Sequence, residues 1–147
     1  MVSVHSGLAF VLLKVGDVEA AEREAASALD GAVFSADRIA AFGTRASVEL
    51  ALDRPEAALA LAERGLGMCP SALQAWAGSL LYLARARALH TLDRTGAALD
   101  AIREARNRLT SIAATLPDAE LREAYIEIDP NRHTLQLARE WLAQEPE

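Results

Sequence analysis

Cysteine and histidine are scarce in this sequence, which limits the chemistry that it can support. Cys69 is the single cysteine, and there are three histidines among the 147 residues. One cysteine can form no internal disulfide and cannot supply a cysteine-based zinc site. His5, His90 and His133 fall on different expected helices, and none has a partner three or four positions away that would make a histidine-rich site. We therefore expect no metal ion and no cofactor.

Clustered positive charge is also missing. Lys14 is the one lysine among 15 basic residues, and the net charge is -6. Proteins that bind nucleic acids gather cations on one face to neutralise phosphates. The apolar stretch at residues 7–13 is too short to span a bilayer and has no basic leading region. We expect no nucleic-acid partner, no membrane association and a cytoplasmic location. The abrupt start inside an apolar helix is also what a piece of a longer protein would show.

Aromatic residues make up only 5% of the sequence, so the core has to be built from alanine and leucine. Both are strong helix formers. Hydrophobic residues make up 52% and charged residues 24%, which is typical of a soluble chain with one core. No segment alternates β-branched and polar residues as a strand would. The composition predicts an all-α fold in a single domain over residues 1–147.

Three segments of the sequence are alike: GDVEAAEREAASAL, DRPEAALALAERGL and DRTGAALDAIREAR. The alanines that this match aligns are Ala21, Ala58 and Ala98, which lie 37 and 40 residues apart. A period in this range is typical of helical repeats. Each segment follows another helical stretch, so the sequence predicts helix hairpins. The expected first helices are residues 3–15, 36–52 and 72–92, and the expected second helices are residues 18–30, 55–67 and 96–115.

Several residues mark the expected helix ends. An aspartate or serine followed three positions later by Glu or Gln favours a capping box, and such pairs occur at Asp53–Glu56 and Ser71–Gln74. Gly65 and Gly67 lie where a second helix should end, and Pro70 prevents it from continuing. These positions support the division into hairpins.

Small and large apolar residues take different expected places in such hairpins. Paired helices approach closely only where their contact faces carry small side chains, which we expect at Ala21, Ala46, Ala58, Ala86 and Ala98. Large residues then fill the gaps between neighbouring hairpins. We expect this of Leu8, Leu12, Phe42, Leu59, Leu66, Tyr82, Leu89 and Leu99.

The last part of the chain breaks the period. We expect a short helix over about residues 118–127 and a final helix over about 131–144, with Asp129 as its cap and Pro130 in its first position. Leu135, Ala138 and 141–142 then share one face of the final helix. Such a segment suits the end of a repeat array, where the terminal element is atypical.

The hairpin period and several residues resemble tetratricopeptide (TPR) repeats over about residues 2–115. The residues are the run Gly16–Ala21, the aligned Ala58 and Ala98, the closing Pro70, and the aromatics Phe42 and Tyr82 early in two first helices. His5 stands where the first unit should carry an aromatic, and the period exceeds the usual length of about 34 residues. The resemblance implies a right-handed superhelical solenoid of antiparallel hairpins with a C-terminal capping helix. Its repeats would be about 2–35, 36–70 and 71–116, with a capping segment at about 117–147.

The end of the chain resembles the C-terminal end of TPR regions in large bacterial regulators that carry a serine/threonine kinase or NTPase module. The matching residues are Asp118, Leu121, Arg122, Tyr125, Ile126, Pro130, Thr134, Leu135 and 137–142. The resemblance implies a sensor or adaptor arm of a bacterial signalling protein. No kinase or NTPase motif is present, so it implies no catalytic residue.

The inner groove of such a solenoid is lined by the first helix of each hairpin. Lys14 and Arg87 are the cations expected there, and no asparagine joins them, which argues against the chaperone-tail recognition of some TPR domains. We expect apolar contacts with a single charged anchor. The candidate groove residues are Ser6, Phe10, Lys14, Gly43, Ser47, Leu50, Leu83, Arg87 and His90.

Other arginines have simpler expected partners. Arg85 and Arg87, two apart on one helix, point in different directions. Arg103 and Arg106 share a face and can pair with Asp100 and Glu104.

Three functions follow from the sequence. The first is a non-catalytic protein-protein interaction module that binds a protein or peptide partner. The second is a structural end cap or self-association domain of a longer repeat protein, which would form a homodimer through exposed apolar helix faces. The third is an enzyme that uses Cys69 or a histidine in a pocket.

Overall fold

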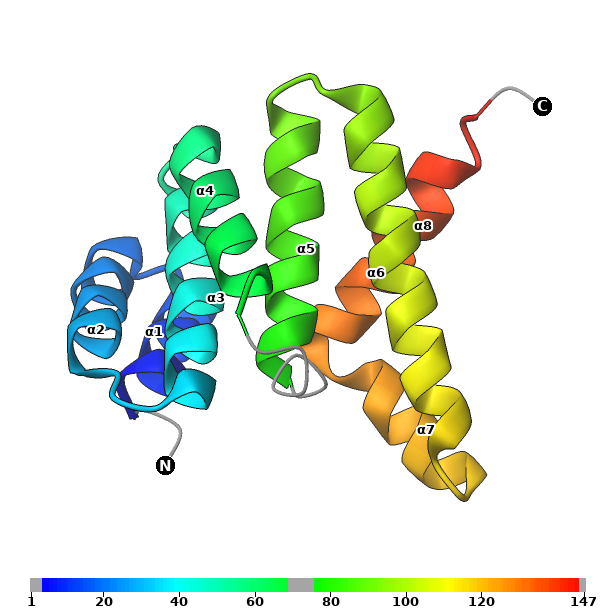
Figure 1. The fold of residues 1–147 in the computed structure, drawn as a ribbon, viewed down its shortest axis with the longest axis horizontal. Coiled ribbons are helices and arrows are strands. Elements are labelled where there is room, and N and C mark those ends of the chain that lie inside the picture. The colour runs from blue at the N-terminus through cyan, green and yellow to red at the C-terminus, as the bar shows by residue number, and fades with distance from the viewer. Residues whose placement is uncertain (1–3, 69–75, 146–147) are drawn as a thin grey trace.

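The computed structural model describes residues 4–68 and 76–145, and every regular element in these residues is a helix (Figure 1). The predicted all-α class is therefore confirmed for the described residues. The helices are α1 (Val4–Val15), α2 (Val18–Gly31), α3 (Ser35–Ala51), α4 (Pro55–Leu66), α5 (Trp76–Thr91), α6 (Thr95–Thr115), α7 (Ala119–Glu127) and α8 (Asp129–Leu142). The predicted Ser71–Gln74 box, Pro70 and Cys69 lie outside the described residues.

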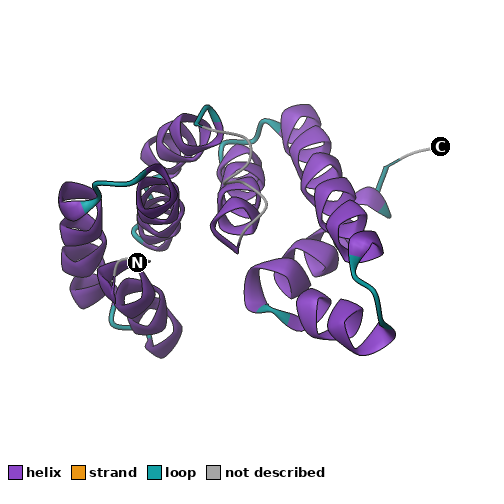
Figure 2. Cartoon of the chain, turned by 60° about the horizontal axis from the view of Figure 1, so that its bottom comes forward, coloured by secondary structure: helices purple, strands orange, loops and turns teal. Residues whose placement is uncertain are grey.

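Consecutive helices pack against each other in pairs, α1 with α2, α3 with α4 and α5 with α6. The first helices also pack side by side, α1 on α3 and α3 on α5. The pairs follow one another along an arc from the N-terminal to the C-terminal end (Figure 2). Helix α7 follows α6 and leads into α8. Helix α8 folds back and packs against α6 and α5 (Figure 1). None of the described helices is long and apolar enough to cross a membrane.

The turn inside each of the three pairs has the same backbone geometry. Gly16, Asp53 and Asp93 adopt left-handed conformations with φ of 86°, 57° and 56°. In each turn the next amide donates a hydrogen bond to the carbonyl five residues earlier, at 2.8 to 3.0 Å. This pattern ends a helix and starts the next with the backbone groups satisfied. The three left-handed residues are 37 and 40 residues apart, which is the spacing of the aligned alanines.

Two predicted caps are wrong. Asp53 does not cap α4, because it occupies the left-handed position of the turn, and Arg54 stands at the N-cap without a side-chain hydrogen bond. Asp129 does not cap α8 either. Ile128 is the N-cap, and the Asp129 carboxylate forms an ion pair with Lys14 at 2.7 Å.

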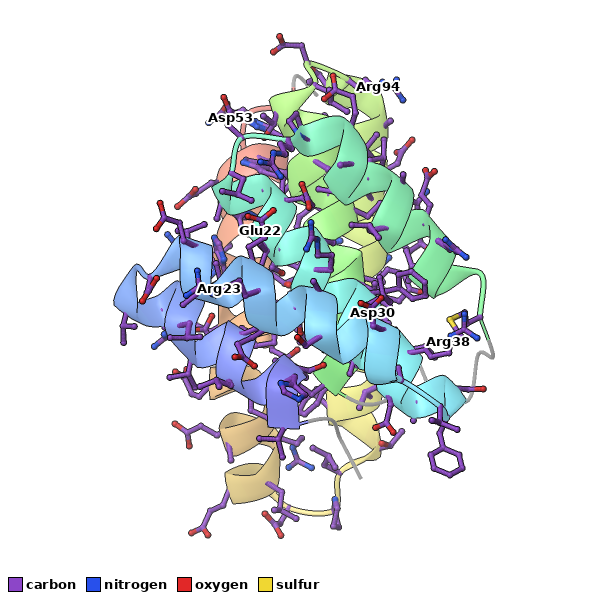
Figure 3. The ribbon with its side chains drawn as sticks, turned by 90° about the vertical axis from the view of Figure 1, so that its left-hand side faces the viewer. Glu22, Arg23, Asp30, Arg38, Asp53 and Arg94 are labelled. Atoms are coloured by element: carbon purple, nitrogen blue, oxygen red, sulfur yellow. The ribbon has the colours of Figure 1, made fainter. Side chains whose placement is uncertain are left out.

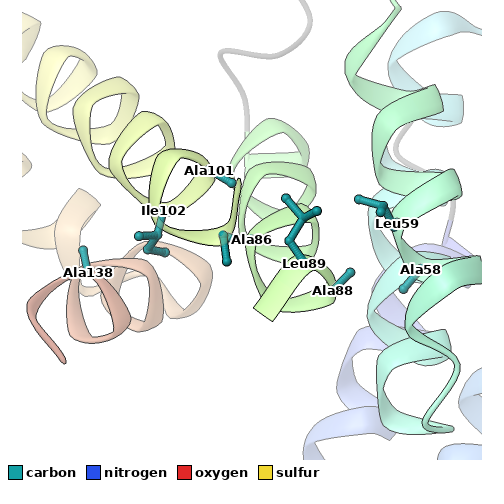
Figure 4. Packing of buried hydrophobic residues seen from close by; sticks show 9 residues of the cluster. Ala58, Leu59, Ala86, Ala88, Leu89, Ala101, Ile102 and Ala138 are labelled. Atoms are coloured by element: carbon teal, nitrogen blue, oxygen red, sulfur yellow. The ribbon is translucent and has the colours of Figure 1, made fainter. Parts of the chain in front are cut away.

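The predicted small-residue contacts are buried. Ala21, Ala46, Ala58, Ala86 and Ala98 are at most 1% exposed. They lie in three apolar clusters that follow one another along the chain. The first joins α1, α2 and α3, the second joins α3, α4 and α5, and the third joins α4, α5, α6 and α8. Figure 4 shows the last of these clusters. Methyl side chains at these positions allow the helix backbones to approach closely, because nothing larger separates them.

Gly65 shows how tight this packing is. Both predicted glycines lie at the end of α4: Gly65 is buried within its last turn, and Gly67 is the C-cap. A Cβ atom at Gly65 would come within 2.7 Å of Leu81 Cδ2 and 3.1 Å of Phe42 Cβ. Leu81 is itself fully buried, so it has little room to move. Glycine is needed here for a close approach of α4 to α5.

Most of the large residues predicted between hairpins are buried or half-buried, and Leu8 is the exception. It is 42% exposed and belongs to an exposed apolar stripe on α1. The stripe consists of Val4, Leu8, Val11 and Val15, which lie four, three and four residues apart and so share one face of the helix. We call these four residues the α1 stripe.

Ion pairs also join the first two helix pairs. Glu22 of α2 accepts hydrogen bonds from Arg45 at 3.4 Å and from Arg54 at 3.1 Å, and Arg45 further pairs with the buried Glu49 at 2.6 Å. Figure 3 shows Glu22 on α2, with Arg23 on the outer surface of the same helix. These contacts fix the packing of α2 on α3 near the turn between α3 and α4.

Candidate binding groove

A cavity of about 190 Å³ lies between α1, α3, α5 and α8. The first helices of the three pairs supply most of its lining, and α8 closes it on the remaining side. The α5 residues Leu80, Leu83 and Ala84 are buried and form an apolar floor. We call this cavity the groove.

Five of the nine predicted groove residues line this cavity. They come from all three first helices: Phe10, Lys14, Ser47, Leu83 and Arg87. The signal in the sequence was their spacing on the first helix of each expected hairpin. Because α1, α3 and α5 pack side by side, equivalent positions on them face the same space.

The other four predicted residues do not line it. Ser6 is fully buried in α1, and its hydroxyl has no partner among the described residues. Gly43 is buried at the contact of α3 with α5, where a Cβ atom would lie 3.4 Å from the Ala77 carbonyl oxygen. Leu50 packs half-buried against the apolar clusters.

His90 lies nearly one turn beyond Arg87 on α5 and does not line the groove. Its ring is exposed and stacks on Trp141 of α8, with centroids 4.3 Å apart and an interplanar angle of 8°. The two rings line a second cavity of about 230 Å³ at the C-terminal end of α8. His90 therefore helps to hold α8 in place.

The sequence reasoning missed the wall that α8 provides. Asp129, Pro130 and His133 line the groove from the first turns of this helix. The final helix was expected to cap the end of the array, and nothing in its pattern says on which side of α5 its start will lie. Asp129 and His133 are four residues apart and so share a face, which is the one available signal.

Aromatic contacts hold Phe10 against the groove. Its ring meets the Trp76 ring edge to face, with centroids 5.2 Å apart and an angle of 88°. The Lys14 ammonium lies 5.3 Å from the centroid of the same ring. Phe10 is thus a fixed apolar wall with a cation beside it, since both arrangements are favourable for an aromatic ring.

Helix α1 and the start of α8 meet at the groove. Lys14 Nζ of α1 lies 2.7 Å from Asp129 Oδ2 of α8. Both side chains are more than a third exposed, so water and salt screen the attraction. The pair is therefore weak enough to open, and it satisfies the one carboxylate that lines the groove.

Arg87 enters the groove from α5 without an acceptor. It is half-buried, and no carboxylate, hydroxyl or carbonyl group among the described residues accepts a hydrogen bond from its guanidinium. Burial lowers the pKa of Arg87, because it removes water from the charged group. The guanidinium nevertheless stays charged at any physiological pH.

Burial also lowers the pKa of His133. The charges of Arg87 and Lys14 lower it further, while Asp129 and Glu140 act in the opposite direction. The groove thus holds two permanent cations, one carboxylate and a histidine whose charge depends on pH.

Unlike Arg87, the arginines Arg85, Arg103 and Arg106 outside the groove have hydrogen-bond partners within the described residues. Arg103 pairs with Asp100 at 2.9 Å, as predicted, and with Glu145 at 2.8 Å. Glu104 pairs with Arg85 at 3.0 Å instead of with Arg103 or Arg106. The predicted pairing of Arg106 with a carboxylate is therefore wrong; it donates to the Asn107 side chain.

The histidines and the described carboxylates do not gather into a metal site. No group of three His, Cys, Asp or Glu residues within 4–68 and 76–145 is placed to hold a metal ion. His5 instead pairs with Glu24 at 2.6 Å near the start of the chain.

What the groove offers is an apolar floor, an aromatic wall and an unpaired guanidinium, which are elements of recognition. Neither models of known protein families nor curated proteins nor solved structures give a match to this chain.

Proposed function

We propose that the chain is a non-catalytic protein-protein interaction module that holds a segment of a partner protein in the groove. The observation that carries the proposal is the convergence of α1, α3, α5 and α8 on one cavity with apolar walls and a charged anchor. Grooves of this kind bind peptide side chains by burying apolar groups and fixing one polar group. The cavity of about 190 Å³ is of a size for one or two side chains, with the rest of the segment lying along the first helices.

The proposal includes the finer architecture. The recurring turn and the side-by-side packing of α1, α3 and α5 support a right-handed TPR-like solenoid that ends in α8. The resemblance of the last residues to the ends of bacterial regulator arms supports a cytoplasmic adaptor or sensor arm of a signalling protein.

The direct test is a selection from a random 12-residue peptide display library on the purified chain, followed by calorimetric titration of the selected peptides. We expect Phe10→Ala and Arg87→Glu to weaken binding about 10-fold or more, because each removes a wall or the charge of the groove. Matched controls are Val11→Ala on the exposed side of α1 and Arg23→Glu on the outer face of α2, which should leave affinity unchanged. Circular dichroism melts confirm that each variant is folded. Selected peptides that ignore both groove substitutions would place binding elsewhere and reject the assignment.

A second function, self-association or the stacking of a further helix pair, is favoured by the α1 stripe. The positions 37 residues after Val4 and Val11 are Ala41 and Val48 of α3, and both are fully buried. Val48 packs in the cluster that contains Ala21 and Ala25 of α2. Helix α3 packs this face against the preceding helix pair. The corresponding face of α1 is also apolar, but no helix among the described residues covers it.

Sedimentation at increasing protein concentration tests this second function. A dimer that dissociates on Val11→Glu would support self-association through the α1 stripe. A monomer at all concentrations would reject self-association and leave the groove proposal intact.

A further inference from the structure

We propose that Arg87 and His133 form a receptor for an acidic side chain, so that the partner segment carries an aspartate or glutamate at the position that enters the groove. The inference rests on the proposed function and names the chemistry of the partner. The occupant is a peptide carboxylate within a segment, and the apolar floor of the groove receives the residue beside it.

The first observation is a comparison of the half-buried arginines. Seven arginines among the described residues are half-buried, and six of them donate a side-chain hydrogen bond to a protein acceptor. The six are Arg45, Arg85, Arg103, Arg106, Arg108 and Arg122. Arg87 is the seventh, and it has no such acceptor within the described residues. A guanidinium that has lost part of its water and has gained no partner is costly, so an incoming acceptor is favoured there.

The second observation is the balance of charge in the groove. The chain as a whole carries -6, yet its groove lining holds Lys14 and Arg87 against one carboxylate, Asp129. Lys14 already satisfies that carboxylate at 2.7 Å. The field left at Arg87 is positive, and it attracts an anion against the charge of the rest of the molecule.

The apolar surroundings strengthen this attraction. Leu80 and Leu83 of the floor are buried, and the Phe10 ring lines the groove from α1. Water is partly excluded from such a site, so an ion pair inside it is stronger than one on the surface. The methylene groups of a glutamate or aspartate can lie on the leucines while the carboxylate meets the planar fork of the guanidinium with two parallel hydrogen bonds.

A carboxylate fits this balance better than a phosphate group. A bound phosphoryl group carries close to two negative charges at neutral pH. It would lie in a cavity of about 190 Å³ that also contains the Asp129 carboxylate. The single charge of a carboxylate matches the single uncompensated guanidinium.

His133 makes this binding depend on pH. The groups that face it are Arg87 of α5, Lys14 of α1, and Asp129 and Glu140 of its own helix. Burial, and after it the two cations, lower the pKa of His133, and a bound carboxylate beside it would raise that pKa again. Binding then takes up a proton, so affinity should increase as the pH falls through the range in which His133 becomes protonated.

The experiment uses the full chain and peptides from the random 12-residue library. We expect the selected peptides to share an acidic position, and a peptide with Gln or Asn at that position to bind about 10-fold or more weakly. Arg87→Gln should abolish this difference between the acidic peptide and its amide analogue, and Arg87→Lys should retain part of it, because lysine keeps the charge and loses the fork. Arg23→Gln, which removes one positive charge from the outer face, should change nothing. Affinity should fall with rising sodium chloride and rise on mild acidification, and His133→Gln should remove the pH dependence.

The outcomes separate the inference from the function on which it rests. If peptides bind at the groove but the acidic and amide forms bind equally well, the inference is wrong and the interaction module stands. If no peptide is selected that responds to Phe10→Ala or Arg87→Glu, both fail. A phosphorylated form of the peptide that binds more tightly than the acidic form would overturn the preference for carboxylate. If Arg87→Gln does not fold, the acidic and amide peptides compared on the unaltered chain decide the matter alone.

Discussion

The first and last helices of the molecule treat their apolar residues in opposite ways. Helix α1 leaves Val4, Leu8, Val11 and Val15 between 42% and 74% exposed. Helix α8 turns Ala138 into the core and packs against α5 and α6, and its outer face carries charged and polar residues. One end of the array is closed and the other is open.

The difference teaches that one element, α8, both closes the array and lines the groove of the proposed interaction. Helix α8 closes the last apolar cluster with Ala138, and its first turns supply Asp129 and His133 to the groove. Helix α1 contributes Phe10 and Lys14 to the groove from one face, while its opposite face stays uncovered. The groove therefore lies between a last helix that is packed into the core and a first helix whose outer apolar face is exposed.

The largest expected difference comes from placing a carboxylate at each end. Ala138→Glu would bury an unpaired charge in the cluster beside Ile102, and we expect it to lower the free energy of unfolding by about 3 kcal/mol or more. Val11→Glu places the same group on an exposed position and should change the free energy by no more than about 0.5 kcal/mol. Urea unfolding followed by circular dichroism measures both. Equal losses at the two positions would mean that α1 is covered in solution.

A smaller difference is expected from shortening one large side chain at each end. Trp141→Ala removes a half-buried ring that packs on the last cluster and stacks on His90, and we expect a loss of about 1–3 kcal/mol. Val15→Ala at the open end, where the side chain is 72% exposed, should cost almost nothing. Thermal melts at matched concentrations give both values. A neutral Trp141→Ala would show that the stack does not hold α8.

The arrangement of the helices was largely predictable, because local signals agree with one another. The alanines of the repeat are buried where the hairpin pattern places them, and the left-handed residues Gly16, Asp53 and Asp93 follow the same period. A capping box was still predicted wrongly at Asp53. The Asp-x-x-Glu pattern is compatible with a cap and also with a left-handed turn residue, since aspartate tolerates both conformations.

The groove was predictable only in the part that the repeat determines. Phe10, Ser47 and Arg87 follow from equivalent positions on packed first helices, because they lie 37 and 40 residues apart. The wall from α8 does not follow, because the direction in which a terminal helix folds back depends on tertiary packing and leaves no period in the sequence. Leu8 was misplaced for a related reason. A repeat pattern predicts an apolar face but does not say whether a neighbour covers it.

The ion pair between Lys14 of α1 and Asp129 of α8 should contribute little to stability. Lys14→Met and Asp129→Asn are each expected to lower the free energy of unfolding by at most about 1 kcal/mol, since both side chains are more than a third exposed. A double-mutant cycle in urea isolates the pair energy, and added salt should reduce it. A coupling well above this limit would mean that the pair closes the groove more firmly than its exposure indicates.

The smallest effect is the pH dependence that His133 adds at the closed end. Burial, with the charges of Arg87 and Lys14, lowers the pKa of His133 in the folded protein below its ordinary value near 6.5. Below about pH 6.5 the unfolded chain therefore binds more protons than the folded one, so the folded state loses stability as the pH falls from there to the lowered pKa. His133→Gln should flatten this part of the stability curve and leave stability above neutral pH unchanged in slope. Arg87→Gln removes one cause of the lowered His133 pKa, so it should narrow the pH range over which stability is lost. Urea unfolding at a series of pH values tests both variants, and an unaltered slope in His133→Gln would show that other groups produce the dependence.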